Sequence, residues 1–186
     1  MNPILLDFPS EFETERLIIR SPRPGDGKDV YQAIRASKEQ LKQWLPFAQK
    51  DQTEEETEVN IREAYINFIK REDLRLLVFA KETGAFIASS GLHRINWDVP
   101  RFEIGYWIDT RYSGKGYMTE AVRGICDFAF YELGANRIEI CCDEQNIKSR
   151  AIPERLGFKQ EGLFINDSVA FNGSGLRNTC IYAKVR

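Results

Sequence analysis

One stretch of the sequence constrains the fold more than any other. Residues 101–133 run from an alternating apolar strand, through a turn with two glycines, into an amphipathic helix. Gly114 and Gly116 stand where the helix starts, and backbone N–H groups there lack partners and carry a partial positive charge. Glycine permits positive φ and lets a ligand approach the backbone closely. The segment therefore predicts a strand–turn–helix unit whose turn binds phosphate oxygens.

Two common phosphate-binding patterns do not fit this turn. A nucleoside-triphosphate P-loop needs GxxxxGK[ST], which is absent. A dinucleotide fingerprint needs a glycine where Thr119 stands, and its strand–helix–strand unit belongs at the start of the fold. A loop that only caps a helix is the remaining alternative for a bare pair of glycines.

Apolar patterning predicts the neighbouring elements. Strands are expected at 16–20, 74–80, 85–95, 101–109, 137–143, 158–164 and 176–184. Helices are expected at about 24–37, 53–71, 116–133 and 146–156. A capping box at Thr53 and Glu56 marks the start of the second helix, and Gly134 marks the end of the third. The second of these helices is expected to bury an apolar face of Val59, Tyr65, Ile66, Phe68 and Ile69. The third is expected to bury Met118, Ala121, Val122, Ile125 and Ala129.

The order of these elements predicts the fold class. An antiparallel meander followed by a strand–helix–strand crossover gives an α/β (α+β) domain over residues 1–186. Its central sheet is expected to be mixed, mostly antiparallel, of about six to seven strands and flanked by helices. The length suits one domain with a real core.

Composition excludes several classes of function. The formal net charge is −2, so the basic excess typical of a nucleic-acid-binding protein is missing. No apolar run approaches the ~18 residues of a membrane span. The four cysteines lack metal-ligand spacing and are expected to be reduced core residues, with Cys141 and Cys142 on opposite strand faces. We therefore expect a cytoplasmic protein without nucleic-acid, membrane or metal partners.

Three segments together resemble one family. They are Arg111-x-x-Gly114-x-Gly116, the strand Ile104–Ile108 before it, and the later run Asn146-x-x-Ser149-x-x-Ile152-x-Glu154-Arg155-Leu156-Gly157-Phe158. The set resembles the GNAT superfamily of N-acetyltransferases, most closely the branch with ribosomal-protein N-terminal (alanine/serine) acetyltransferases. The resemblance implies acetyl-CoA as co-substrate and direct attack by a primary amine in a ternary complex.

The resemblance also implies which residues hold acetyl-CoA. Backbone N–H groups of the glycine turn would hold the pyrophosphate, and the pantetheine arm would lie like an extra strand beside residues 106–108. Asn146, an expected helix N-cap, would also bond the pantetheine arm or a bound water. The implied cofactor-binding residues are Tyr106, Trp107, Ile108, Arg111, Ser113, Gly114, Lys115, Gly116, Tyr117, Met118, Thr119, Asn146 and Ser149.

Two residues are candidates for the proton transfers. Glu103 shares a strand face with Gly105, and a carboxylate there can take a proton from the substrate ammonium, directly or through water. A solvated or structural glutamate is the alternative. Ser149 resembles the family position that protonates the departing CoA thiolate. Pro153 cannot donate to the carbonyl of Ser149, so we expect the helix to bend there and to aim the serine hydroxyl.

Two strand residues carry open interpretations. Gly105 in an otherwise aromatic and β-branched strand indicates a bulge or a close approach by a neighbour. In the family a bulge on this strand splays the sheet, and a backbone N–H there polarises the thioester carbonyl. His93 is the only histidine, and a lone strand histidine more often packs or hydrogen-bonds than catalyses.

The acceptor amine is not defined by a motif. The resemblance places acceptor choice in the segments Ala36–Asn60 and Asn166–Arg177 and favours a protein N-terminal α-amine. A small amine such as a polyamine, an amino acid or an antimicrobial is the alternative, as is a catalytically weak acetyl-CoA sensor. Trp44 and Trp97 are expected to be exposed and to line either the acceptor cleft or the contact of a homo-oligomer.

Overall fold

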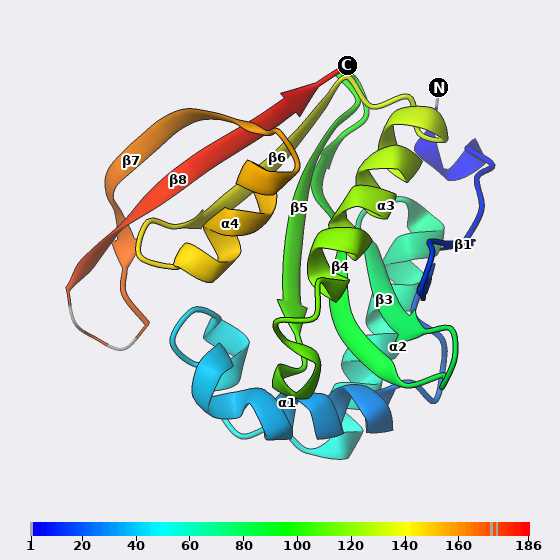
Figure 1. The fold of residues 1–186 in the computed structure, drawn as a ribbon. Coiled ribbons are helices and arrows are strands. Elements are labelled where there is room, and N and C mark those ends of the chain that lie inside the picture. The colour runs from blue at the N-terminus through cyan, green and yellow to red at the C-terminus, as the bar shows by residue number, and fades with distance from the viewer. Residues whose placement is uncertain (1, 172, 174) are drawn as a thin grey trace.

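The computed structural model describes residues 2–171, 173 and 175–186, which form one eight-stranded sheet with helices on both faces (Figure 1). Across the sheet the strand order is β1-β2-β3-β4-β5-β6-β8-β7. The strands are β1 (Glu11–Glu13), β2 (Leu17–Arg20), β3 (Leu74–Ala80), β4 (Phe86–Asn96), β5 (Arg101–Ile108), β6 (Arg137–Asp143), β7 (Lys159–Val169) and β8 (Leu176–Val185). The helices are α1 (Gly27–Leu41), α2 (Glu54–Lys70), α3 (Tyr117–Tyr131) and α4 (Ile147–Arg155), with short 3-10 turns η1 (Pro3–Leu5), η2 (Pro46–Gln49) and η3 (Thr110–Tyr112).

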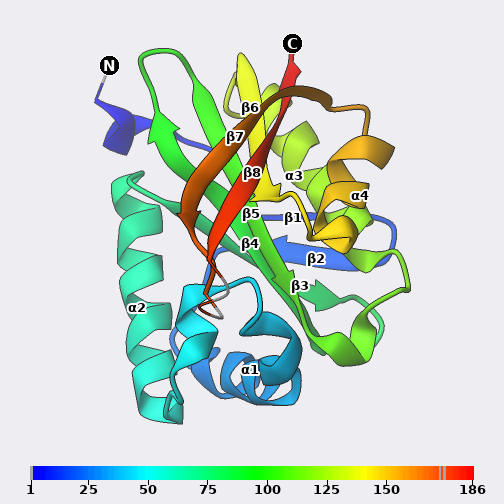
Figure 2. The same ribbon diagram turned by 90° about the vertical axis from the view of Figure 1, so that its left-hand side faces the viewer.

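The helices divide between the two faces of the sheet. Figure 2 shows α1 and α2 on one side and α3 and α4 on the other. The face under α3 carries the larger core, in which the five apolar α3 residues expected to be buried are all buried. The face under α1 and α2 carries a smaller cluster around Leu77, Phe79 and Phe86. The expected mixed α+β architecture is therefore confirmed. Among the described residues, no helix is long and apolar enough to cross a bilayer.

The sheet opens between β5 and β6. These two strands pair in parallel, but only from Arg101↔Arg137 to Glu103↔Glu139. Beyond that point β5 stays paired with β4 as far as Ile108, while β6 stays paired with β8 as far as Asp143. The two strands diverge in Figure 1, with α4 lying beside β6 at the opening. Within the described part of the chain, residues 104–108 of β5 therefore have no neighbouring strand on this side.

The number of strands and several element boundaries differ from those expected; β7, for example, continues past the expected end at Phe164 to Val169. The sheet has eight strands rather than six or seven, because β1 pairs with β2 over only three residues and is too short to show a pattern. Helix α1 continues past the expected end at Ser37 to Leu41. Ser37 is fully buried and its Oγ accepts the Thr110 N–H at 2.9 Å, so this part of α1 packs against the loop after β5.

The expected apolar face of α2 is wrong. Phe68 is buried, but Val59, Ile66 and Ile69 are about half exposed and Tyr65 is 38% exposed. The helix instead buries Thr57, Ile61 and Phe68. Its apolar residues lie on two sides of the helix, and packing against the sheet selects Ile61, two turns before Phe68. The capping box of Thr53 and Glu56 is confirmed.

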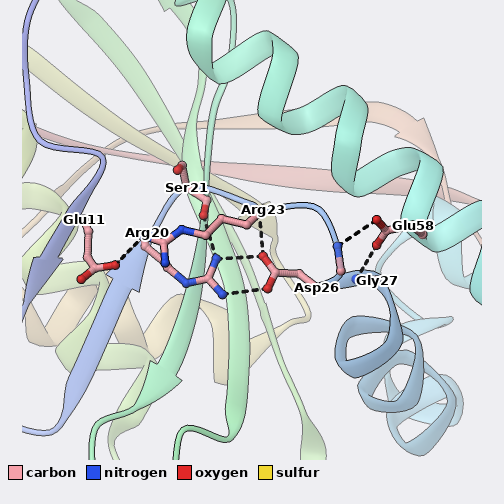
Figure 3. A network of polar contacts seen from close by, with 8 residues as sticks. Glu11, Arg20, Ser21, Arg23, Asp26, Gly27 and Glu58 are labelled. Carbon is pink, nitrogen blue, oxygen red and sulfur yellow. Dashed lines mark hydrogen bonds and ion pairs between the residues drawn. The ribbon is translucent and has the colours of Figure 1, made fainter.

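A polar network fixes the start of α1 against α2 (Figure 3). Arg20 of β2 donates two hydrogen bonds to Asp26, at 2.8 and 2.7 Å, and both side chains are 13% exposed. The Glu58 carboxylate of α2 accepts the N–H groups of Gly25 and Gly27 at 2.9 and 3.0 Å. A Cβ atom on Gly27 would lie only 2.5 Å from the Glu58 Cα. The contact between the helices therefore requires a glycine at position 27.

We predict that Gly27→Ala destabilises the protein by about 2–3 kcal/mol, because the added methyl group must push α2 away. For a chain of this size the melting temperature should fall by roughly 4–12 °C in a thermal scan monitored by circular dichroism. Gly162→Ala is the matched control, since a Cβ atom there meets only the Phe164 Cε1 at 3.9 Å. Equal melting temperatures for the two variants would contradict this account of the α1–α2 contact.

Candidate functional site

The glycine turn has the backbone geometry that the sequence predicts. Gly114 and Gly116 adopt φ values of 78° and 81°, which confirms the expected positive φ. Gly116 is the N-cap of α3, and no side chain among the described residues caps that helix. The first-turn N–H groups are thus left for a ligand, and the helix dipole favours an anion there.

Asp109 holds the predicted phosphate ligand Arg111 beside this turn. The Asp109 side chain is fully buried, caps η3 by accepting the Arg111 N–H at 3.0 Å, and accepts two bonds from the Arg111 Nε at 3.0 Å. These bonds to Asp109 raise the pKa of the Arg111 guanidinium. The Arg111 side chain is 57% exposed, so the cation is fixed in direction while it still faces solvent.

A second arginine supports the turn, and the sequence did not indicate it. The Arg16 guanidinium donates to the Lys115 carbonyl at 3.1 Å and lies 4.5 Å from the centroid of the Tyr117 ring. Its Nε pairs with Glu120 at 2.6 Å, and the hydroxyl of Thr14 donates to the same carboxylate. Glu120 in the first turn of a helix that is expected to bind an anion was the available signal, since an acid beside an anion needs a cation nearby. The sequence could not say that this cation comes from 104 residues earlier.

Tyr106, Ser149 and Pro153 form one arrangement at the opening between β5 and β6. The Tyr106 hydroxyl donates to the carbonyl of Ser149 at 2.9 Å, and the Ser149 Oγ donates to the Tyr106 hydroxyl at 3.2 Å. The Ser149 carbonyl is the group that a residue at position 153 would normally bond within the helix, and Pro153 has no N–H. Pro153 therefore leaves this carbonyl to Tyr106. Burial raises the pKa of Tyr106, so its hydroxyl stays protonated and able to donate.

Asn146 has the predicted N-cap role, since its Oδ1 accepts the Ser149 N–H at 3.1 Å. This bond fixes the start of α4 and the backbone of Ser149. Burial raises the pKa of the nearby Cys142 thiol to about 12, which keeps that thiol neutral and unreactive.

A cavity of about 500 Å³ lies on the α1–α2 side of β5. We call it the β5 cavity. Apolar residues of α1 and η2 and polar residues of α2 close it over the strand surface. It is lined by Val30, Ile34, Leu45, Phe47, Gln52, Glu56, Thr57, Asn60, Arg75, Ser89, Ser90, His93, Gly105, Tyr106 and Trp107. Tyr106 thus contributes both to this cavity and to the bonds with Ser149.

Gly105 makes room for a close neighbour rather than for a bulge. The register of β4 and β5 runs unbroken from Ala88↔Ile108 to His93↔Glu103, and the irregularity lies beyond it, between His93 and Asn96. A Cβ atom on Gly105 would lie 3.3 Å from the His93 Cδ2. The Ser90 hydroxyl donates to the Gly105 carbonyl at 2.8 Å. The strand divergence follows from the end of β5–β6 pairing at Glu103.

Glu103 lies on the same strand face as its register partner His93, but its carboxylate has a partner. The Arg94 Nη1 donates to it at 2.7 Å, and the Glu103 side chain is 17% exposed. It is not among the residues that form the β5 cavity wall. Burial raises the pKa of the adjacent Cys141 thiol to about 12. The proposed role of Glu103 as a base stays a prediction.

The two segments expected to choose the acceptor meet at a second cavity, of about 300 Å³. Gln43 and Trp44 come from the first segment, and Ala170, Phe171, Leu176 and Arg177 from the second. Residues 172 and 174 of the second segment lie outside the described residues. Trp97 does not take part: it packs on Phe102 with ring centroids 5.3 Å apart and donates to the Arg71 carbonyl, so its expected exposure is wrong.

The cysteines and acids do not form a metal centre in the part of the chain that the structure describes. No group of three or more His, Cys, Asp or Glu side chains there is placed to hold an ion. The cysteines are free, and Cys126, Cys142 and Cys180 are buried.

Comparison with known proteins identifies the family. A family model described as an acetyltransferase (GNAT) domain matches residues 16–159. A protein of Bacillus subtilis (strain 168), YdaF, provisionally named a ribosomal N-acetyltransferase, is 34% identical over 162 residues, 86% of each chain. The ribosomal-protein-serine acetyltransferase of Escherichia coli (strain K12) is 27% identical over 160 residues, 83% of this chain and 88% of the relative.

Solved structures agree on the fold. The microcin C7 self-immunity acetyltransferase MccE, solved in complex with acetyl-CoA and AMP, superposes with a TM-score of 0.87 at 22% identity over 96% of this chain and 98% of that one. The family match covers the strand–turn–helix unit, the β5–β6 opening and α4, which are the parts of the fold that build the site. The chain belongs to the GNAT acetyltransferase family.

Proposed function

We propose that this protein transfers the acetyl group of acetyl-CoA to a primary amine by direct attack. The observation that carries the proposal is the β5–β6 opening beside the uncapped start of α3. An extended pantetheine arm can pair with the free edge of β5 at residues 104–108 while the pyrophosphate meets the N–H groups of residues 114–119. MccE, which has the same fold, was solved with acetyl-CoA and AMP.

In this proposal Arg111 and Lys115 add positive charge near the pyrophosphate, and Ser113, Tyr117, Met118 and Thr119 complete the turn. Trp107 and Ile108 continue the β5 edge toward it. Backbone N–H groups of β5 near Gly105 polarise the thioester carbonyl, and the amine enters through the β5 cavity, which shares Gly105 and Tyr106 with that edge.

We assign protonation of the leaving thiolate to Ser149. Its Oγ donates to the Tyr106 hydroxyl at 3.2 Å, so Tyr106 holds the serine hydroxyl in place at the β5–β6 opening. Asn146 and Pro153 position the pair, one through the Ser149 N–H and the other by leaving its carbonyl free. Two groups on the opposite face, Glu103 and His93, are available as proton acceptors from the amine.

The acceptor that we propose is the N-terminal α-amine of a protein, in line with the names of YdaF and the Escherichia coli relative. An α-ammonium has a pKa of about 8 and needs a weaker base than a lysine side chain, at about 10.4. A ribosomal protein is the first candidate acceptor. The cytoplasmic location expected from the sequence is part of this proposal.

Acetyl-CoA thiol release, measured with a panel of N-terminal peptides and small amines, tests the function. We expect release that depends on an acceptor and a matching acetylated product by mass spectrometry. Ser149→Ala should lower kcat about 100-fold while acetyl-CoA affinity stays within twofold, because the hydroxyl acts only as the thiolate leaves. Ser10→Ala, at an exposed serine of the N-terminal segment, is the control.

Each outcome of this experiment has a clear meaning. Acetylation of small amines but not peptides would replace the protein acceptor with the small-amine alternative. Binding of acetyl-CoA without release from any acceptor would contradict the proposed reaction and favour a sensor.

Replacing Pro153 with Ala should lower kcat about tenfold with little loss of stability. The new N–H at position 153 would compete with Tyr106 for the Ser149 carbonyl, and the Tyr106–Ser149 pair would lose its fixed geometry. Steady-state kinetics and a thermal scan on the same sample separate the two effects. An unchanged kcat would remove the positioning role of Pro153.

A further inference from the structure

We propose that His93 is the group that takes the proton from the acceptor ammonium, and that Asp73 positions it. This inference rests on the proposed acetyl transfer. His93 lies on β4, and its Nδ1 is 2.7 Å from the Asp73 Oδ2, just before β3. The two side chains are 31% and 35% exposed, so the pair is neither locked in the core nor free in solvent.

The bond to Asp73 decides which nitrogen can accept a proton. An ionised carboxylate has no hydrogen to donate, so Nδ1 must carry the proton that joins the two groups. The neutral imidazole then has its lone pair on Nε2. This is the arrangement in which a carboxylate orients a histidine as a base.

Two glycines aim this Nε2 at the site. Gly91 on β4 and Gly105 on β5 are direct register partners. Cβ atoms built on them would lie 3.1 Å from the His93 Cε1 and 3.3 Å from its Cδ2, and the one on Gly105 would lie 3.6 Å from Nε2. The imidazole therefore occupies the space that two side chains would fill, with Nε2 toward the backbone of β5 in the β5 cavity.

Gly91 is needed for this arrangement on independent grounds. Its φ of 151° is unusual for other residues, and a Cβ atom would lie 2.6 Å from the Leu74 carbonyl oxygen. The glycine pair thus brings β3, and Asp73 with it, close to the imidazole. The close packing of β3, β4 and β5 at Gly91 and Gly105 therefore both forms the Asp73–His93 pair and places the His93 ring in the wall of the β5 cavity.

Glu103 is less well placed for the same task. It is the register partner of His93, but the Arg94 guanidinium donates to its carboxylate at 2.7 Å, and Glu103 is not one of the residues that line the cavity. The charged groups facing His93 are Asp73 and Arg75 of the β3 segment, Glu103 of β5, Arg94 of its own strand and Glu56 of α2. Arg75 is tied to Ser89 and Asn60, at 3.0 and 2.6 Å.

The acceptor ammonium must lose two protons during the transfer. The ammonium gives one proton to the His93 Nε2, and the neutral amine forms a bond to the thioester carbonyl carbon. The carbon–sulfur bond breaks, and Ser149 gives its hydroxyl proton to the sulfur. The new amide nitrogen loses its second proton, which returns to Ser149 through water. His93 then returns its proton to water, so the sum is amide, thiol and one released proton.

The pH dependence of His93→Gln tests the assignment. In the wild type, kcat/KM should rise with pH as the base loses its proton, because only an unprotonated base can accept one from the ammonium. The variant should lose about 100-fold in kcat/KM at pH 7. Its remaining pH dependence should report only deprotonation of the acceptor ammonium, whose pKa is about 8 for a peptide. Above pH 8 the difference in kcat/KM between the variant and the wild type should shrink. The affinity for acetyl-CoA should stay within twofold of the wild-type value.

Matched variants separate the two candidate bases. Asp73→Asn should shift the rising limb of the pH profile rather than remove it, and Asp73→Glu should restore part of the wild-type profile. Glu103→Gln should keep the limb. If Glu103→Gln removes the limb and His93→Gln retains it, the proposal is overturned.

A measurement without turnover separates this inference from the proposed function. The chain has a single histidine, so its ¹⁵N resonances need no assignment. We expect the Nδ1–H tautomer in the neutral wild type and a mixture of tautomers in Asp73→Asn. A neutral Nε2–H tautomer would overturn the role of His93 even in an active enzyme, whereas the expected tautomer in a protein that acetylates no amine would contradict the proposed function alone.

Discussion

The end of β5–β6 pairing at Glu103 is the constraint on which the rest of the site depends. Backbone N–H and C=O groups of an unpaired strand edge need partners, from water, another strand or a ligand. Here the edge of β5 leads through η3 to the start of α3, where N–H groups also lack a capping side chain. One extended ligand with a phosphate group can satisfy both sets. The same divergence leaves space for α4 to bring Ser149 to Tyr106.

Several residues near the candidate site are unfavourable for the helix or strand that contains them. Pro153 sits inside a helix, Gly105 and Gly91 face each other inside strands, and Arg94 has a φ of 46°. Each weakens its own element, and each has a partner that uses the result. Pro153 leaves a carbonyl for Tyr106, and the glycines admit the His93 ring. Such departures concentrate at functional sites because the surrounding fold can stabilise them.

The sequence was sufficient for local chemistry, for the four helices and for seven of the eight strands of the described residues. The glycine turn, the buried face of α3, the capping box at Thr53 and the N-cap at Asn146 are all set within a few residues, and all are confirmed. The buried face of α2 was wrong, because apolar residues on two sides of that helix leave the choice to tertiary packing.

Contacts between distant segments could not be predicted. The pairing of Arg16 with Glu120 joins residues far apart in the sequence, and no local pattern in either segment indicates the partner. The Asp73–His93 pair depends on the register between β3 and β4, which only the folded sheet defines. A lone strand histidine therefore gave no sign of its partner.

Isothermal titration of acetyl-CoA into Gly116→Ala and Gly134→Ala tests the central claim most directly, that the start of α3 holds the cofactor phosphates. Both glycines have positive φ, at 81° and 64°, so the two variants carry similar backbone strain near opposite ends of the same helix. We predict one acetyl-CoA per wild-type chain, at least a tenfold weaker Kd for Gly116→Ala, and wild-type affinity for Gly134→Ala. No binding by the wild type, or equal losses in the two variants, would contradict the account.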